Sequence, residues 1–169
     1  AGGFDPRERL TRLRRLFYVE GSVLRLDELG AEANDPSRPE NYYLLFNGVL
    51  FAAVHLVGSH NNLTPNNEAA LTEHLERSEA NRAHLERVAA VAKAEDASSL
   101  VLLFHANPGF EASSPPRGYG PFAESLASLL RQFQGPVLAV HGDTHRFRFD
   151  QPLRDPGHGG VLRRFFRLE

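Results

Sequence analysis

The sequence contains no cysteine, and this absence excludes disulfide bonds and thiolate metal ligands. It leaves the cellular compartment open, because a cysteine-free chain folds equally well in reducing and oxidising surroundings. The chain also has no apolar run of about 20 residues, the length that a membrane helix needs. The longest apolar run, 49–57, has the length of a strand and includes His55. We therefore expect a soluble protein with no membrane partner.

An excess of charge of either sign is missing too. The formal net charge is −2 and the pI is about 6.5, which argues against a general nucleic-acid surface. Of the 19 basic residues all but Lys93 are arginine. These arginines could form a phosphate-binding surface, because a guanidinium binds phosphate through two hydrogen bonds. They could equally reflect a coding bias, since they alternate with Glu and Asp along predicted helices.

The length of 169 residues fits one domain, 1–169, and the composition, 41% hydrophobic and 24% charged, is that of a globular protein. The chain opens at Ala1 in a helix approach and stops in the strand-like VLRRFFRLE. We interpret it as a domain truncated at both ends. Strand edges bared in this way would favour a homo-oligomer.

Local patterns predict alternating strands and helices. Asp5 and Pro6 are typical of a helix start, and Asn47-Gly48 of a tight hairpin turn. The expected elements are a helix from Pro6 past Phe17, a loop over 19–40, strands 42–46 and 49–57, a helix from Asn66 or Asn67 to Lys93 with an apolar stripe of Leu71, Leu75, Leu85, Val88 and Ala92, a strand 99–104 buried on both faces, a helix 121–134, a buried strand 136–140 and a final strand. The fold class is therefore α/β, a sheet covered by helices.

Three of these strands share one pattern at their carboxyl ends. Each apolar run is followed by a histidine among Asn, Asp, Gly or Pro, in VGSHNN, FHANPGF and VHGDTH. Ligands of α/β sheets bind beyond the carboxyl ends of the strands, so we expect these loops to form one site. Imidazole and carboxylate ligands suit Mn, Fe or Zn. The candidate ligands are His60, His105, His141, Asp143 and His145.

The three loops resemble the last three signature blocks of the calcineurin-like metallophosphoesterases, and more narrowly an uncharacterised bacterial branch of that superfamily. The blocks Gly-Asn-His-Asp/Glu, His before Pro, and Gly-His-x-His correspond to 58–61, 105–108 and 142–145. The resemblance implies part of an α/β/β/α sandwich with a mixed sheet. It also implies hydrolysis of phosphate mono- or diesters by metal-activated water. His105, Asp143 and His145 would be metal ligands, and His60 would be the catalytic histidine. Ser59, Asn61, Asn62 and His141 are accessory candidates.

Two departures from the family pattern lower the expected activity. Ser59 stands where a ligand asparagine is usual, and Asp143 stands where a ligand histidine is usual. No Asp-x-His or Gly-Asp-x-x-Asp block precedes the first loop, so the carboxylate that bridges two metals in the family has no counterpart. We therefore expect one divalent cation rather than two, and an isolated chain that is weakly active or inactive.

The alternative functions are a non-catalytic binding or interaction module of the same fold with degenerate ligands and, less favoured, an unrelated single-metal hydrolase. Four histidines lie outside the predicted site. We expect His74 and His84 to be solvated on their helix, His55 to pack or bond locally, and His158 to lie in a glycine-rich turn or a mobile lid.

Overall fold

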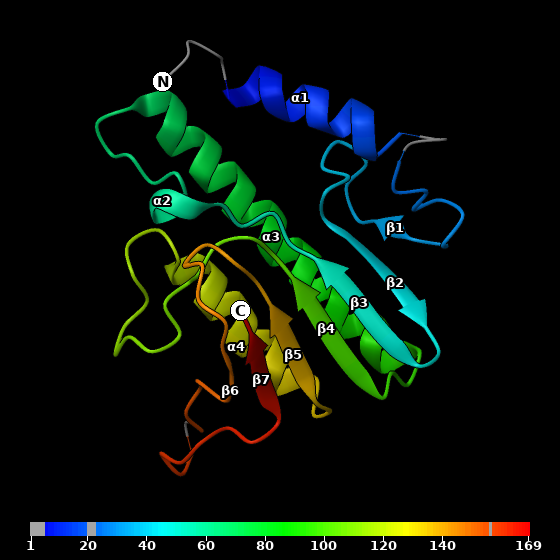
Figure 1. Cartoon of the computed structure of the whole chain (residues 1–169), viewed down its shortest axis with the longest axis vertical. Helices are drawn as coiled ribbons and strands as arrows, with labels where there is room; N and C mark the ends of the chain where they lie inside the picture. The colour runs from blue at the N-terminus through cyan, green and yellow to red at the C-terminus, as the bar shows by residue number, and fades with distance from the viewer. Residues whose placement is uncertain (1–5, 20–22, 156) are drawn as a thin grey trace.

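The structure, a computed structural model, describes residues 6–19, 23–155 and 157–169. One seven-stranded mixed sheet runs through it in the order β1-β2-β3-β4-β5-β7-β6 (Figure 1). Strands β3, β4, β5 and β7 are parallel, and β1, β2 and β6 pair antiparallel at the two sides. The predicted α/β class is confirmed. The elements are α1 (Pro6–Phe17), β1 (Glu32–Ala33), β2 (Tyr42–Phe46), β3 (Val49–Ala53), α2 (Gly58–Asn61), α3 (Glu68–Ala94), β4 (Ser99–Leu103), α4 (Gly120–Gln132), β5 (Val137–Val140), β6 (Phe149–Asp150) and β7 (Phe165–Leu168).

The local signals of the sequence are largely confirmed. Asn47 and Gly48 have φ values of 48° and 78°, as the tight turn between β2 and β3 requires. The Asn67 side chain caps α3 by accepting a hydrogen bond from Ala70 N at 3.1 Å. The predicted N-cap of α1, Asp5, lies outside the described residues. The prediction of a loop over 19–40 is wrong in one detail, because Glu32 and Ala33 form the short strand β1, which pairs with β2.

Helices α3 and α4 pack against each other on one face of the sheet (Figure 1). The strand residues that point at them are fully buried, among them Leu50, Leu100, Val137 and Phe165. The opposite face carries apolar side chains too, but they are only half-buried, and they form rows such as Phe51, Val101, Leu138 and Phe166. The prediction that these strands are buried on both faces is wrong for the described residues, because α3 and α4 cover only one face of the sheet.

The sandwich implied by the resemblance needs a second sheet. The described residues form one sheet only, because β1, β2, β6 and β7 extend it sideways instead of starting another. No helix in the described part of the chain is long and apolar enough to cross a membrane.

The buried face of α3 differs from the predicted apolar stripe. Leu75 is exposed, and the stretch 74–84 of the helix buries four polar side chains instead: His74, Arg77, Asn81 and His84. Their spacing of three and four residues places them on one face of the helix. This polar face lies beneath the segment that leads from β3 to α2, and it positions the loop described next.

Candidate functional site

The loops that follow β3, β4 and β5 are tied together at the carboxyl edge of the sheet. Ala106 N donates to Leu56 O at 3.3 Å, and Gly142 N donates to His105 O at 3.0 Å. Because the three strands are parallel and adjacent, all three histidine-bearing loops leave the sheet at this edge. Thr144 Oγ1 adds a hydrogen bond of 2.5 Å to Glu169 at the end of β7.

Asp143 lies where the three loops meet. Its Oδ2 accepts a hydrogen bond from Asn107 N at 3.3 Å. Its Oδ1 lies beside Gly58, so closely that a β-carbon there would be 3.4 Å away. The carboxylate is exposed, and no ion pair binds it within the described residues. Asp143 therefore offers an uncompensated negative charge at the centre of the predicted site.

Three exposed histidines lie on the loops that meet at Asp143. They are His60 after β3, His105 after β4 and His145 after β5, and their rings make no hydrogen bond or ion pair to described residues. Among the residues that the structure describes, no three His, Asp or Glu side chains are close enough together to hold a metal ion. The fold thus brings the predicted loops to one edge but does not preassemble their side chains as a closed metal site.

The loop after β3 has an unusual backbone. Ser59, His60, Asn61 and Asn62 all have left-handed φ values, of 51°, 60°, 53° and 58°. The left-handed region costs an ordinary residue about 1–2 kcal/mol, so four in succession persist only if the surroundings hold them. Two turn hydrogen bonds, Asn62 N to Ser59 O at 3.3 Å and Leu63 N to His60 O at 3.0 Å, close this left-handed turn.

Asp143 and His145 also have positive φ values, of 85° and 59°. Six of the nine non-glycine residues with positive φ in the described chain therefore lie in two of the three loops. Backbone strain of this kind concentrates at functional sites, where it is part of how side chains are presented.

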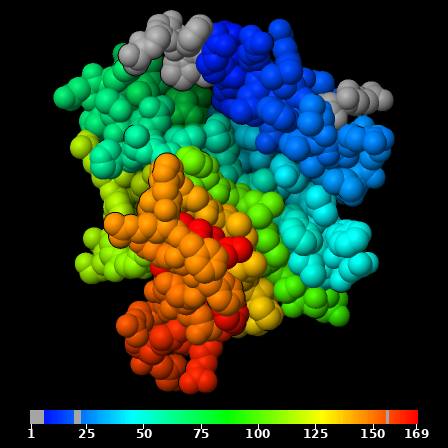
Figure 2. Space-filling view, viewed as in Figure 1, coloured from blue at the N-terminus to red at the C-terminus, as the bar shows by residue number. Residues whose placement is uncertain are grey.

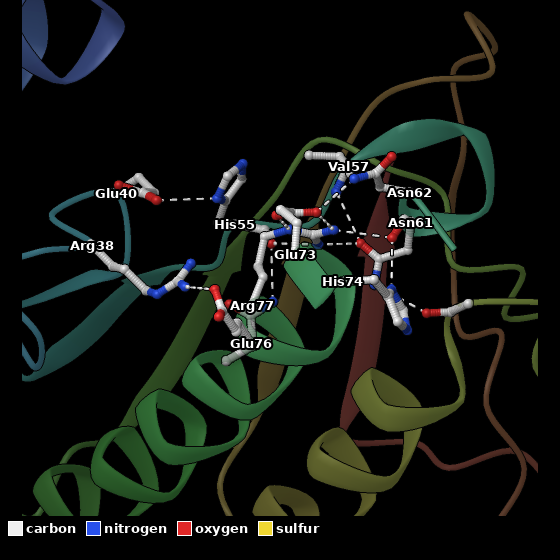
Figure 3. A network of polar contacts seen from close by, with 12 residues as sticks. Arg38, Glu40, His55, Val57, Asn61, Asn62, Glu73, His74, Glu76 and Arg77 are labelled. Atoms are coloured by element: carbon white, nitrogen blue, oxygen red, sulfur yellow. Dashed lines mark hydrogen bonds and ion pairs between the residues drawn. The ribbon is translucent and has the colours of Figure 1, made fainter. Parts of the chain in front are cut away.

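The buried side chain of Arg77 holds the left-handed turn in place (Figure 3). It donates to Asn61 at both the side-chain oxygen and the carbonyl, the latter at 3.0 Å, and its Nε pairs with Glu73 at 2.6 Å. The His74 ring contributes through Nδ1, which lies 2.8 Å from Asn61 O. Burial raises the pKa of Glu73, but the hydrogen bonds from Arg77 and Asn62 outweigh it and lower the pKa below its ordinary value.

Asn61 is buried by these contacts and serves the fold. Besides the bonds from Arg77, its Nδ2 donates to Gly118 O at 3.0 Å. Both ends of its amide are therefore used inside the protein. Asn62 differs, because its Nδ2 bonds Glu73 at 2.7 Å while the residue is only half-buried. Ser59 is exposed.

Gly118 completes the support of the turn from the side of α4. Its φ is +87°, and a β-carbon at this position would lie 1.8 Å from His60 O. Only glycine allows the two backbones to approach so closely. Neither Arg77 nor Gly118 was predicted as a site residue. The one signal in the sequence is an arginine on a helix face that also carries His74 and Asn81.

A second polar network fixes the segment between β3 and the turn. Asn81 Nδ2 donates to His55 O at 2.9 Å, and Asn41 Oδ1 accepts from His55 N at 2.7 Å. The His55 ring lies 3.1 Å from Glu40, which also binds Arg14. Burial raises the pKa of Glu40, but the hydrogen bonds from His55 and Arg14 outweigh it and hold the pKa at about 2. His55 thus bonds locally.

The remaining histidines divide between the interior and the surface. His74 and His84 are buried, so their prediction as solvated helix residues is wrong: they face the sheet side of α3. Burial lowers the pKa of His84 to about 4. His158 is exposed, 3.6 Å from Asp155, in a turn.

His141 lies inside the protein, whereas Asp143 and His145 are exposed. Its ring stacks on Phe104 at 5.3 Å and 9°, and Nδ1 lies 3.1 Å from Gly142 O. Burial lowers the pKa of His141. The spacing of 141, 143 and 145 therefore does not bring these three side chains to one surface, because the strand ends at Val140 and the chain turns.

A cavity of about 540 Å³ borders the left-handed turn on the side of α3. Gly58, Ser59 and Asn62 line it together with Glu73 and Arg77.

Comparison of the chain with protein-family models, with curated proteins and with solved structures finds no match.

Proposed function

We propose that the carboxyl edge formed by the loops after β3, β4 and β5 is a phosphoester-hydrolysing site that depends on a divalent cation. The observation that carries the proposal is the position of Asp143, whose carboxylate contacts the other two loops beside Gly58 and Asn107 N. The strained left-handed turn that presents His60 supports it. Phosphate mono- or diesters are the proposed substrates.

The donors suit one cation better than two. His105, Asp143 and His145 supply two imidazoles and a carboxylate, a ligand set that Mn, Fe or Zn accepts. All three are exposed at the same edge, and Asp143 has no cationic side chain bound to it in the described chain. Three protein ligands leave room for water, and a bound cation would lower the pKa of that water. A second cation would need a bridging carboxylate, and no Asp-x-His or Gly-Asp-x-x-Asp block precedes the first loop to supply one.

His60 is the proposed residue that protonates the leaving oxygen or steadies the phosphate. The left-handed turn fixes its backbone through Arg77, Asn61 and Gly118, while its ring stays exposed. A general acid must reach the leaving oxygen within hydrogen-bond distance, and a rigid turn limits the positions that the ring can take. The turn therefore acts as a positioning element for His60.

A binding module with degenerate ligands is the second candidate. It is favoured by the absence of any group of three metal-binding side chains in the described residues, and by Asn61, whose amide is used within the fold. A module would keep the loops and the turn but show neither cation uptake nor turnover.

Cation uptake and hydrolysis of p-nitrophenyl phosphate separate the two candidates. We expect measurable binding of Mn or Zn, and turnover barely above background because the second cation is missing. His145→Ala is expected to abolish uptake, whereas His158→Ala, a change at a fully solvated turn, should leave it intact. His74→Ala is unsuitable as a control because His74 bonds the left-handed turn.

Absence of any cation uptake would favour the module. Robust metal-dependent turnover that survives His60→Ala would show that the catalytic histidine and the one-cation proposal are both wrong.

A further inference from the structure

A second cavity lies on the other side of α4, away from the polar network of α3. It is bounded by α4, by the segment 108–115 and by Leu153, Arg154, Leu162 and Arg164, and its volume is about 350 Å³. Its wall is largely apolar, with Pro108, Phe110, Phe122, Leu126, Leu130, Leu153 and Leu162. This volume is within the range of natural small-molecule sites, about 300–1,000 Å³.

The charged residues of this cavity are all of one sign. Three arginines line it, Arg131, Arg154 and Arg164, and no Asp or Glu of the described chain does. Arg164 is anchored because its guanidinium donates to Phe133 O at 2.8 Å and to Leu130 O. Arg131 and Arg154 are exposed and bind no carboxylate in the described chain. The cavity therefore combines an apolar wall with two exposed guanidiniums that no described carboxylate binds.

We propose that this cavity binds a small amphipathic monoanion, a medium-chain carboxylate. The alkyl chain would lie against Phe110, Leu126 and Leu153, where burial of apolar surface contributes about 25 cal/mol per Å². The carboxylate would bind Arg131 or Arg154, because a guanidinium offers two parallel donors to a carboxylate. A neutral ligand of the same shape would leave these charges unpaired. This site is independent of the proposed phosphoester site.

In the space-filling view the orange-red part of the chain projects as a lobe at the bottom of the molecule (Figure 2). Leu153, Arg154, Leu162 and Arg164 of this lobe form one wall of the cavity, and α4 forms the other. The lobe is held against α4 by Arg164, whose guanidinium donates to Phe133 O at 2.8 Å and to Leu130 O at the carboxyl end of that helix. The cavity therefore lies between two parts of the molecule that are fixed relative to each other.

Titration of the ¹⁵N-labelled chain with octanoate, 1-octanol and octylammonium tests the proposal by amide chemical-shift changes. We expect octanoate to shift residues of α4 and of 108–115 and 153–164, octanol to bind at least about tenfold more weakly, and octylammonium not to bind. Arg131→Gln combined with Arg154→Gln should weaken octanoate binding about tenfold. Arg163→Gln, in the same segment but outside the cavity wall, should not.

A cavity-filling change, Ala123→Leu, should remove octanoate binding while the far-UV circular dichroism stays that of the parent chain. The proposal is overturned if octanol binds as tightly as octanoate, if octanoate shifts residues elsewhere, or if the double arginine variant binds like the parent. The phosphoester site is read out separately by cation uptake, so failure of one proposal leaves the other intact.

Discussion

Replacing Gly118 with alanine tests how the left-handed turn is held. The new β-carbon would lie 1.8 Å from His60 O and 2.7 Å from His60 C, both of them backbone atoms. The backbone of the turn or of Gly118 must therefore move by more than 1 Å to reach an ordinary contact distance. Such a movement also breaks the hydrogen bond from Asn61 Nδ2 to Gly118 O.

The loss of stability can be built from these contributions. Alanine at positive φ costs about 1 kcal/mol, and the lost buried hydrogen bond costs about 1 kcal/mol more. Displacing the turn adds at least another 1 kcal/mol, because it disturbs the bonds from Arg77 to Asn61. We expect Gly118→Ala to lower the free energy of unfolding by about 3 kcal/mol, the sum of these terms.

Gly159→Ala is the matched control. Gly159 also has a positive φ, of +67°, but nothing lies within 4 Å of the added β-carbon. Urea unfolding followed by circular dichroism should therefore show a loss of only about 1 kcal/mol for this variant. Equal losses in the two variants would refute the claim that the His60 carbonyl is packed against Gly118.

Three further predictions follow from buried and half-buried groups. Arg77→Met should cost about 3 kcal/mol in urea unfolding, because it removes the buried donor to Asn61 and breaks the ion pair with Glu73. Arg82→Met, at an exposed ion pair, should cost less than about 1 kcal/mol, and equal losses would contradict a structural role for Arg77. The pKa of His84 is lowered to about 4 in the folded protein, so stability is full above about pH 6.5 and falls as the pH drops from there toward 4, by about 2 kcal/mol at pH 5. Glu40, with a pKa of about 2, loses its contribution to the free energy of unfolding only below about pH 4.5, so it does not mask the effect of His84. A free energy of unfolding that is flat between pH 7 and 5 would contradict the lowered pKa of His84. The half-buried apolar rows of β3, β4, β5 and β7 predict concentration-dependent self-association in light scattering, and a monomer at all concentrations would count against it.

The elements that follow local rules could be predicted from the sequence. The Asn47-Gly48 turn, the Asn67 cap and the apolar runs of β4 and β5 each express a preference of a few neighbouring residues. The placement of Asp143 with the other two loops also followed, because adjacent parallel strands end at the same edge.

Features that depend on distant contacts could not be predicted in this way. His74 and His84 looked solvated because a polar residue on a helix is usually exposed, but here they and Arg77 bind the backbone between β3 and α3 or pack beneath it. The left-handed turn left no local signal, since Ser59 and His60 take their φ values from Arg77 and Gly118, far along the chain. The half-buried sheet face was missed because apolar runs look alike whether one face or both are covered.

Paramagnetic broadening by Mn²⁺ tests the central claim most directly, because it locates a weakly bound cation in solution. In the ¹⁵N-labelled chain we predict that substoichiometric Mn²⁺ first broadens the amide signals of 57–62, 105–108 and 141–145, and that His145→Ala removes this effect while His158→Ala does not. Broadening confined to other acidic surfaces, such as Glu79 and Glu86 on α3, or no localised broadening at all, would contradict a cation site at the carboxyl edge of the sheet.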